Sequence, residues 1–262
     1  MAERARIRSG LTEAGDLAAF GARAVRALPG VPRFASEALR HAGVLVRGST
    51  LFIFVMTAFI GFAQTTFAFF FLRSAGASDY LAFFTGITTP RAAAPIMFGY
   101  VFAAKVGCAM VAEIGTARIN EEIDALETEA IDPMRYIVGT RIVGALLFVP
   151  IAVGVALLAV TVGSYVDGVI VLQALPGATF LNNHWAAQTI ADQGIALLSL
   201  GTMGMAIVIV ACFFGYRASG GPAGVGRAVA KSIVVNLVLV HVIASFYLGV
   251  FYGQDLKLPI GG

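Results

Sequence analysis

The stretch AEIGTARINEEIDALETEAIDP, from Ala112 to Pro133, is a dense acidic block between two long apolar runs. Six of the chain's 15 acidic residues fall in its second half: Glu121, Glu122, Asp124, Glu127, Glu129 and Asp132. If the block is helical, the spacing i, i+4, i+7, i+11 makes one apolar stripe of Ile119, Ile123, Leu126 and Ala130. Such a stripe would lie in water unless something covered it. The pattern therefore favours a docking helix over about 118–132 rather than a merely solvated charged face.

The composition of the whole chain is that of a membrane protein. Of 262 residues, 58% are hydrophobic and 13% are charged, and the mean hydropathy is +0.86. A soluble domain of this length carries roughly a quarter charged residues. The excess apolar surface is therefore expected to face lipid, and Cys108 and Cys212, both in apolar runs, are expected to be buried free thiols. No continuous apolar segment typical of a cleavable signal peptide is seen in residues 1–30.

Five apolar runs reach the roughly 20 residues that a helix needs to cross a bilayer. They are Ser49–Leu72, Ala92–Ala112, Ile142–Val166, Gly194–Tyr216 and Ser232–Tyr252. The sequence thus predicts an all-α integral membrane protein with five transmembrane helices. The acidic block lies between the second and the third.

The residues before the first run are different in kind. From Leu11 to Arg47 apolar and Arg residues share helical periodicity, with a break at Pro29 and Pro32. This pattern predicts helices that lie in the membrane surface. A disordered basic tail is the alternative, and it suits residues 1–10 better than the rest.

The distribution of positive charge predicts the orientation. All Lys and Arg except Arg73, Arg91 and Lys257 fall on one side of the five runs, and positive loops stay in the cytoplasm. We therefore expect a cytoplasmic N-terminus and acidic block, and an extracytoplasmic C-terminus. The expected divisions are a basic leader with interfacial helices at 1–48, a permease-like domain at 49–253 and a short extracytoplasmic tail at 254–262.

No motif for catalysis is present. The sequence lacks a P-loop, a zinc-protease motif and a nucleophile elbow, and its three His residues have no shared spacing. The glycine-rich SGGPAGVGRA from Ser219 to Ala228 could be a phosphate-cradling loop, but it lacks the lysine and hydroxyl of a P-loop. A tight cytoplasmic turn is the favoured interpretation. We predict no enzyme activity, no metal and no nucleic-acid partner.

Two charges and an aromatic cluster within the apolar runs are candidate functional residues. Lys105 and Glu113 lie in the second run, just over two helical turns apart, so each is expected to meet a partner on another helix. Their role is either structural or in gating. Phe side chains crowd the first run, where lipid-facing packing is the ordinary explanation. Some of them could instead line a cavity for acyl chains, with Phe52, Phe59 and Phe62 as candidates.

These residues resemble a known family. EEIDALETEAIDP, preceded by AEIGTARIN and followed by TRIVGA, is similar to the signature of the MlaE/YrbE permeases, and GYRASGGPAGVGRAV matches a second signature. These permeases are the membrane subunits of bacterial ABC transporters that work with MCE proteins to move lipids. The resemblance extends from about Leu39 to Tyr252.

The resemblance implies an N-terminal elbow helix, five spans and a cytoplasmic coupling helix that docks on a separate ATPase. The contact surface would be Glu121, Glu122, Asp124, Ala125, Leu126 and Glu127. ATP and Mg²⁺ would be bound by the partner ATPase dimer, and this chain would bind no cofactor of its own. The cargo would be phospholipids, fatty or mycolic acids, or sterols, passed between a cavity at the permease dimer and a ring of MCE subunits. The location would be the bacterial inner membrane.

Two details resemble the actinobacterial YrbE branch. Thr140-Arg141 stands where many members have Pro-Arg, and Glu122 stands where many have Gln. The Arg-rich leader and the glycine-rich loop look like the B-type subunit of that branch, which favours a heterodimer with an A-type permease over a homodimer.

Two other functions compete with this one. A stand-alone secondary transporter or channel for a hydrophobic solute would usually show inverted repeats and intramembrane charges. Five spans divide poorly into repeats, and such charges are sparse. A membrane-embedded lipid enzyme would need a metal or nucleophile cluster, and the sequence shows none.

Overall fold

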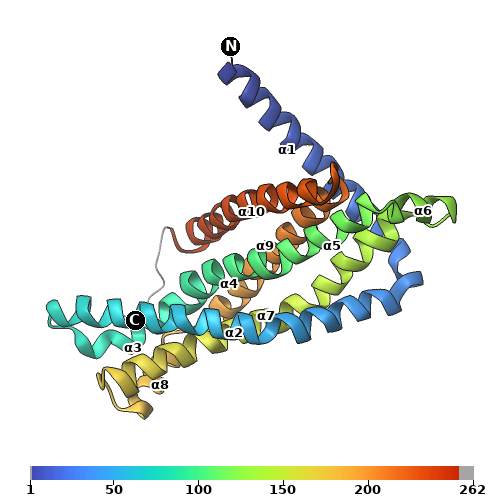
Figure 1. Cartoon of the computed structure of the whole chain (residues 1–262). Coiled ribbons are helices and arrows are strands. Elements are labelled where there is room, and N and C mark those ends of the chain that lie inside the picture. The colour runs from blue at the N-terminus through green and yellow to red at the C-terminus, as the bar shows by residue number, and fades with distance from the viewer. Residues whose placement is uncertain (1, 254–262) are drawn as a thin grey trace. The chain divides into compact units, whose positions relative to one another are not determined.

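The computed structural model describes residues 2–253 and their side chains from Thr12 onward (Figure 1). This part is helical and contains no strand. Five helical segments are long and apolar enough to cross a membrane: Thr12–Ser74, Ser78–Ile119, Met134–Val171, Ile190–Tyr216 and Gly221–Tyr252. The predicted all-α membrane fold with five spans is therefore confirmed. The tail expected at 254–262 lies outside the described residues.

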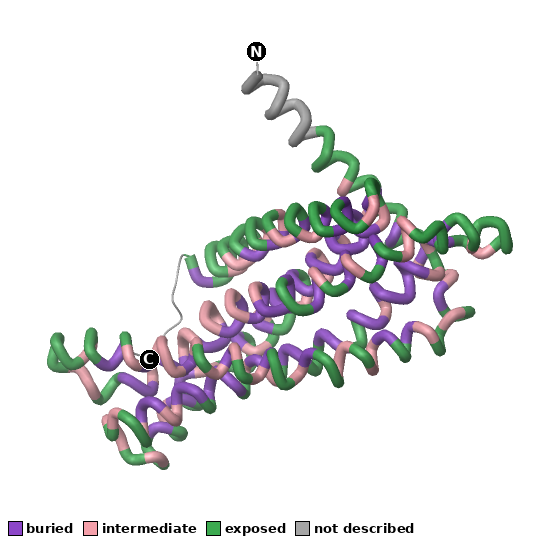
Figure 2. The backbone as a smooth tube through the Cα atoms, viewed as in Figure 1, coloured by how far each residue is buried: buried purple, intermediate pink, exposed green. Residues whose placement is uncertain are grey.

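The N-terminal third forms two long helices joined by a tight 3-10 turn. Helix α1 covers Ala2–Ala27, so the first residues are helical rather than a disordered tail, and η1 covers Leu28–Phe34 with Pro29 and Pro32 at the predicted break. Helix α2 then runs without interruption over Ala35–Ser74 (Figure 2). At 1.5 Å per residue its 40 residues extend about 60 Å, twice the hydrocarbon thickness. The helix that contains the first predicted span therefore begins at Ala35, 14 residues before Ser49.

The later segments also begin before the apolar runs that predicted them. The second comprises η2 (Ser78–Tyr80), α3 (Leu81–Thr88), η3 (Thr89–Ala93), α4 (Ala94–Phe102), η4 (Ala103–Gly107) and α5 (Cys108–Ile119). The third comprises η5 (Met134–Gly139), α7 (Thr140–Tyr165) and η6 (Val166–Val171). A short α8 (Gly177–Ala186) precedes α9 (Ile190–Tyr216) and α10 (Gly221–Tyr252). Segments η3 to η6 are π-helical, a geometry often found at functional sites.

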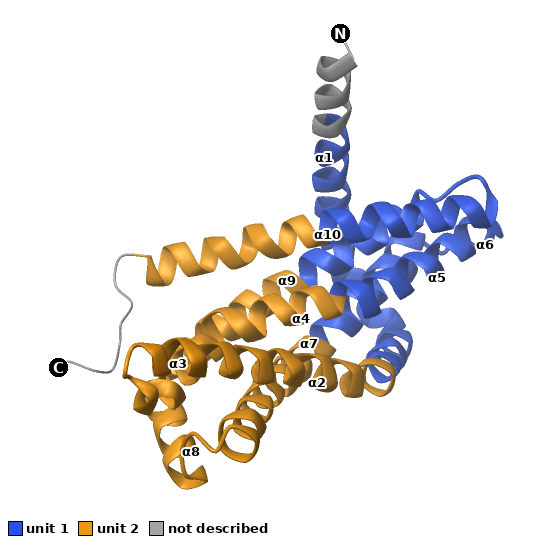
Figure 3. Ribbon diagram, turned by 60° about the vertical axis from the view of Figure 1, so that its left-hand side comes forward, with its two compact units in different colours: residues 1–45, 103–147, 205–236 blue, residues 46–102, 148–204, 237–262 orange. Residues whose placement is uncertain are grey.

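The chain forms two compact units, which are coloured separately in Figure 3. Unit 1 comprises residues 1–45, 103–147 and 205–236, and so gathers the elbow, the acidic block and the glycine-rich turn. Phe20 of α1 packs edge-to-face on Phe213 of α9, with ring centroids 5.6 Å apart. A Cβ on Gly139 would lie 2.5 Å from a Val31 methyl group, so η1 packs closely on η5.

Unit 2 comprises residues 46–102, 148–204 and 237–262. Within it α2 and α7 touch backbone to backbone. A Cβ on Gly61 would lie 2.1 Å from the Val160 carbonyl oxygen, and one on Gly163 would lie 1.9 Å from the Ala58 carbonyl oxygen. Small residues at helix contacts are how membrane helices gain close packing when burial from water offers little. These two glycines therefore fix the approach of α2 to α7.

Candidate functional site

The acidic block forms a short helix of its own rather than one helix over 118–132. Helix α5 ends at Ile119, Glu121 adopts a left-handed conformation with φ 61°, and α6 covers only Glu122–Thr128. Ala130, at φ 59°, stops α6 in a Schellman motif. In this motif the Ile131 N–H donates to the Leu126 carbonyl (2.9 Å) and the Ala130 N–H to the Glu127 carbonyl (3.1 Å). Both reversals use non-glycine residues, which adopt positive φ only when the surroundings impose it.

Burial of Ile123 explains the short helix and corrects the interpretation of the apolar stripe. Ile123 is fully buried within this chain and Leu126 is half-buried, so neither side chain needs a partner protein to shield it from water. The left-handed Glu121 turns the chain between α5 and α6, and in the resulting arrangement Ile123 is buried. Ile119 and Ala130 lie outside α6. The remaining exposed surface of α6 is therefore mostly polar, and docking on it would depend mainly on charge rather than on an apolar face.

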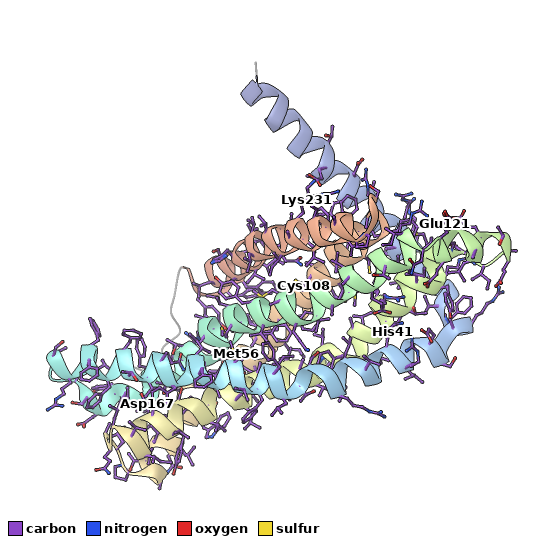
Figure 4. All side chains as sticks on the ribbon, viewed as in Figure 1. His41, Met56, Cys108, Glu121, Asp167 and Lys231 are labelled. Atoms are coloured by element: carbon purple, nitrogen blue, oxygen red, sulfur yellow. The ribbon has the colours of Figure 1, made fainter. Side chains whose placement is uncertain are left out.

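The side chains proposed for contact form one exposed acidic surface. Five of the six predicted contact residues are exposed: Glu121, Glu122, Asp124, Ala125 and Glu127. The sixth, Leu126, is half-buried. Figure 4 shows Glu121 at the α5–α6 turn. Sequence position alone could not tell which side chains the turn would bury.

Among the described residues, internal ion pairs neutralise two of the six carboxylates of the acidic block, those of Asp124 and Asp132. Arg118 Nη1 donates to Asp124 at 2.5 Å and also lies over the Tyr216 ring, and Arg135 pairs with Asp132 at 3.0 Å. Among the described residues no ion pair holds Glu121, Glu122, Glu127 or Glu129. Four carboxylates are thus free to meet a basic partner, and complementary charge of this kind speeds and orients association.

Glu113 and Lys105 have different surroundings. Arg141 Nη2 of α7 donates to the Glu113 carboxylate of α5 at 2.6 Å, so the partner expected on another helix is present. Lys105 lies in the π-helical η4, and its side chain is exposed within this chain. The structure does not bring Lys105 and Glu113 together, and which of them has a gating role remains a prediction.

Two of the three candidate lipid-contacting Phe residues line a groove, and the third does not. An apolar groove between α2 and α7 has a volume of about 240 Å³ and includes Phe59 and Phe62 in its wall. Its other lining residues are Phe54, Val55, Ala58, Val162, Gly163 and Val166. Phe52 is exposed and does not line it. Pockets that enclose a drug-sized ligand have volumes of about 300–1,000 Å³, so this groove can hold part of an acyl chain but cannot enclose a whole lipid.

Sequence reasoning missed a fully buried ion pair. In unit 2, Arg91 donates from Nε to Asp192 at 3.0 Å, and the Tyr252 hydroxyl donates to the same carboxylate at 2.8 Å. The Arg91 guanidinium also lies over the Tyr252 ring, 4.4 Å from its centroid. The sequence did contain a signal for this pair. Arg91 and Asp192 lie just before the second and the fourth predicted spans, at the same side of the membrane, and opposite charges at membrane depth pair with one another.

Comparison with known proteins finds relatives over most of the helical part of the chain. The family model for permease MlaE matches residues 38–249. A probable ABC transporter permease protein of Rickettsia conorii is 28% identical over 236 residues, covering 86% of this chain and 87% of its own.

Two further relatives are similarly named probable ABC transporter permease proteins. That of Synechocystis is 31% identical over 173 residues, covering 66% of this chain and 65% of its own. That of Porphyra purpurea is 30% identical over 152 residues, covering 58% and 57%. The family match covers most of the chain, and the structure supplies the five spans that such a protein needs. The chain therefore belongs to the MlaE permease family and is a multi-pass permease of the ABC transporter type.

Proposed function

We propose that this chain is the permease subunit of an MCE-type ABC transporter that moves lipids across the cell envelope. The observation that carries the coupling part of this proposal is the acidic surface of α6. Ile123 of α6 is buried, and four carboxylates of the acidic block have no ion pair among the described residues. A cytoplasmic ATPase with a basic groove is the partner that such a surface fits. ATP and Mg²⁺ belong to that ATPase, and this chain performs no catalysis.

The ion pair between Glu113 and Arg141 supports a mechanism. It joins the helix before α6 to the helix after it, inside unit 1. A pull on α6 by a closing ATPase would therefore move α5 and α7 together. Lys105, one turn before α5, would move with them, and this is the basis for its proposed part in gating.

The groove between α2 and α7 supports lipid cargo and a second permease. Its lining is wholly apolar, which suits acyl chains of phospholipids, fatty or mycolic acids, or sterols. Because about 240 Å³ is too little for a whole lipid, a partner permease is needed to complete the cavity. We propose an A-type YrbE sibling for that partner, with this chain as the B-type subunit, and a ring of MCE subunits outside.

We further propose that the N-terminus and α6 face the cytoplasm and the C-terminus faces outward. Unit 1 supports this, because it gathers the Arg-rich α1, the arginines on either side of α6 (Arg118 and Arg135) and those around the glycine-rich turn (Arg217 and Arg227). The bacterial inner membrane is the proposed location.

Gentle purification of the tagged chain from its native membrane, followed by mass spectrometry of proteins and lipids, tests the proposal. We expect an ABC ATPase, MCE subunits, a second permease and a retained lipid. Recovery of the chain alone, still able to move a hydrophobic solute in liposomes, would contradict the proposal and favour a stand-alone transporter.

A further inference from the structure

A cavity in unit 1 shares no lining residue with α6 or with the groove between α2 and α7. It is an open cavity with a volume of about 490 Å³, lined by α1, the end of α9 and the start of α10. Its charged lining residues are Glu13, Asp16, Arg217, Arg227 and Lys231. Figure 4 shows Lys231 on α10 next to α1. Nothing in the coupling mechanism uses this cavity.

The glycine-rich turn before α10 shapes one wall. Gly220 and Gly221 have φ of 83° and 69°, a conformation that side chains with a Cβ rarely adopt. A Cβ on Gly224 would lie 1.7 Å from the Ser219 carbonyl oxygen, so this position must also be glycine. Arg227 folds back over the turn, with Nη2 3.2 Å from where a Gly220 Cβ would stand. The turn thus places the Arg227 guanidinium at the cavity.

The charges in the cavity are unequally paired. Arg217 Nη1 donates to the Asp16 carboxylate at 2.8 Å, so these two neutralise each other. Arg227 and Lys231 are exposed, lie one helical turn apart on α10, and form no ion pair within the described part of the chain. Like charges at i and i+4 repel. An anion bound between Arg227 and Lys231 would remove that repulsion. On the α1 side only the Glu13 carboxylate would repel the anion, because Asp16 is paired with Arg217.

The location of the cavity indicates which anion is available. Helix α9 ends at Tyr216 and α10 begins at Gly221, so the cavity lies at the ends of two transmembrane segments. Lipid headgroups occupy that level of a bilayer, and basic pockets between transmembrane helices bind their phosphates. Phe213, Phe214 and Ala218 add an apolar wall suited to the glycerol and upper acyl carbons.

We propose that this cavity binds the phosphate of an anionic lipid headgroup between Arg227 and Lys231. The lipid would be a resident of the adjacent leaflet rather than cargo. It would hold the start of α10 against the end of α9, because its phosphate pairs with the cations on α10 while its apolar part packs against α9. The proposal does not depend on which solute the permease moves.

The test titrates phosphatidylglycerol into the detergent-purified protein, together with whatever subunits copurify, and counts bound lipids by native mass spectrometry. The variant is Arg227→Gln/Lys231→Gln, and its matched control is Arg47→Gln, an exposed arginine on α2 outside the cavity. With about 1 kcal/mol per basic contact, the double variant should bind phosphatidylglycerol roughly thirtyfold more weakly. Arg47→Gln should bind like the wild type, and Glu13→Gln should bind more tightly.

Competition measurements identify the source of the phosphate, and a charge-preserving variant tests whether a loss of binding is caused by misfolding. Arg227→Lys/Lys231→Arg keeps both charges and should retain binding, whereas phosphatidylcholine and inorganic phosphate should compete poorly. Wild-type binding by the double Gln variant would overturn the site. An equal loss in Arg47→Gln would show diffuse surface attraction instead. Binding of inorganic phosphate as tight as that of phosphatidylglycerol would overturn the lipid assignment in favour of a free phosphate.

Discussion

Arg141 of α7 and Glu113 of α5 form an ion pair of 2.6 Å that spans the acidic turn between their helices. Arg141 is buried, and its Nη1 also donates to the Ile137 carbonyl at 3.0 Å. The pair therefore closes the base of the α5–α6–α7 hairpin. Whatever contacts α6 acts on a hairpin whose two arms are joined.

Breaking this pair should destabilise the protein more than breaking an exposed pair. Glu113→Ala leaves the buried Arg141 charge without its carboxylate. Losses of about 3–5 kcal/mol are typical for fully buried pairs, and about 2 kcal/mol is expected here because Glu113 is half-exposed. Asp16→Ala, which breaks the exposed Arg217 pair, should cost about 0–1 kcal/mol. Thermal unfolding in detergent compares the two, and equal melting temperatures would contradict the proposed role of Glu113.

The Arg91–Asp192–Tyr252 cluster predicts a ranking of two substitutions. Asp192→Asn removes the carboxylate that faces a buried guanidinium and should cost about 3–5 kcal/mol. Tyr252→Phe removes one hydrogen bond to that carboxylate but keeps the ring under Arg91, and should cost about 1.5–3 kcal/mol. Thermal stability in detergent measures both. An equal loss of stability in Tyr252→Phe and Asp192→Asn would contradict the view that the Arg91–Asp192 ion pair is the main interaction of the cluster.

His184 in α8, between the spans, predicts a pH dependence of stability. Its ring is within 3.2 Å of both Thr85 Oγ1 and Thr161 Oγ1, and burial lowers the pKa of His184 to about 4. The unfolded chain, with an ordinary histidine pKa near 6.5, binds more protons between these values. Stability should therefore fall as pH drops from about 6.5 to 4, by on the order of 3 kcal/mol, and change no further below.

Replacing His184 by Gln keeps hydrogen-bonding groups but removes this titration. The difference in unfolding temperature between pH 7 and pH 4.5 should shrink in His184→Gln relative to the wild type. An unchanged difference would assign the acid sensitivity to other groups.

Helix packing in unit 2 predicts a sharp contrast between two glycines of α7. Gly163→Ala places a methyl group where the Ala58 carbonyl already lies, so α2 must move away. Gly154→Ala, in the same helix, meets nothing within 4 Å and should be neutral or slightly stabilising. We expect Gly163→Ala to lower the yield of folded protein on size-exclusion chromatography while Gly154→Ala does not. Similar yields would mean that α2 and α7 do not pack as closely as described.

Much of the fold could be predicted because apolar runs and prolines act locally. The five spans follow from hydropathy alone, and Pro29 and Pro32 mark the break before α2. The starts of the helices could not be predicted so well. Arg40 and Arg47 suggested a surface helix separate from the first span, yet α2 passes through both, because helical hydrogen bonds continue whether the surroundings are lipid or water.

The candidate site was predictable in composition and unpredictable in shape. The acidic residues stand out in the sequence, but the left-handed Glu121 and Ala130 arise from tertiary burial of Ile123, which periodicity does not reveal. Likewise, the position of Glu113 in an apolar run predicted a partner on another helix. Arg141 lies 28 positions further along the chain, and only folding brings its guanidinium next to the Glu113 carboxylate. Local patterns identified the charged residues, and long-range packing determined which of them are paired.

The most direct test of the central claim reverses charge on α6. The variant Glu121→Lys/Glu122→Lys/Glu127→Lys changes three exposed carboxylates that form no ion pair within the described residues, and Asp79→Lys changes an exposed carboxylate in η2 of unit 2. Both tagged proteins are purified from native membranes, and the copurifying ATPase is quantified. We predict that the α6 variant inserts normally but loses the ATPase, while Asp79→Lys retains it. Undiminished ATPase recovery with the α6 variant would show that this surface is not the coupling site.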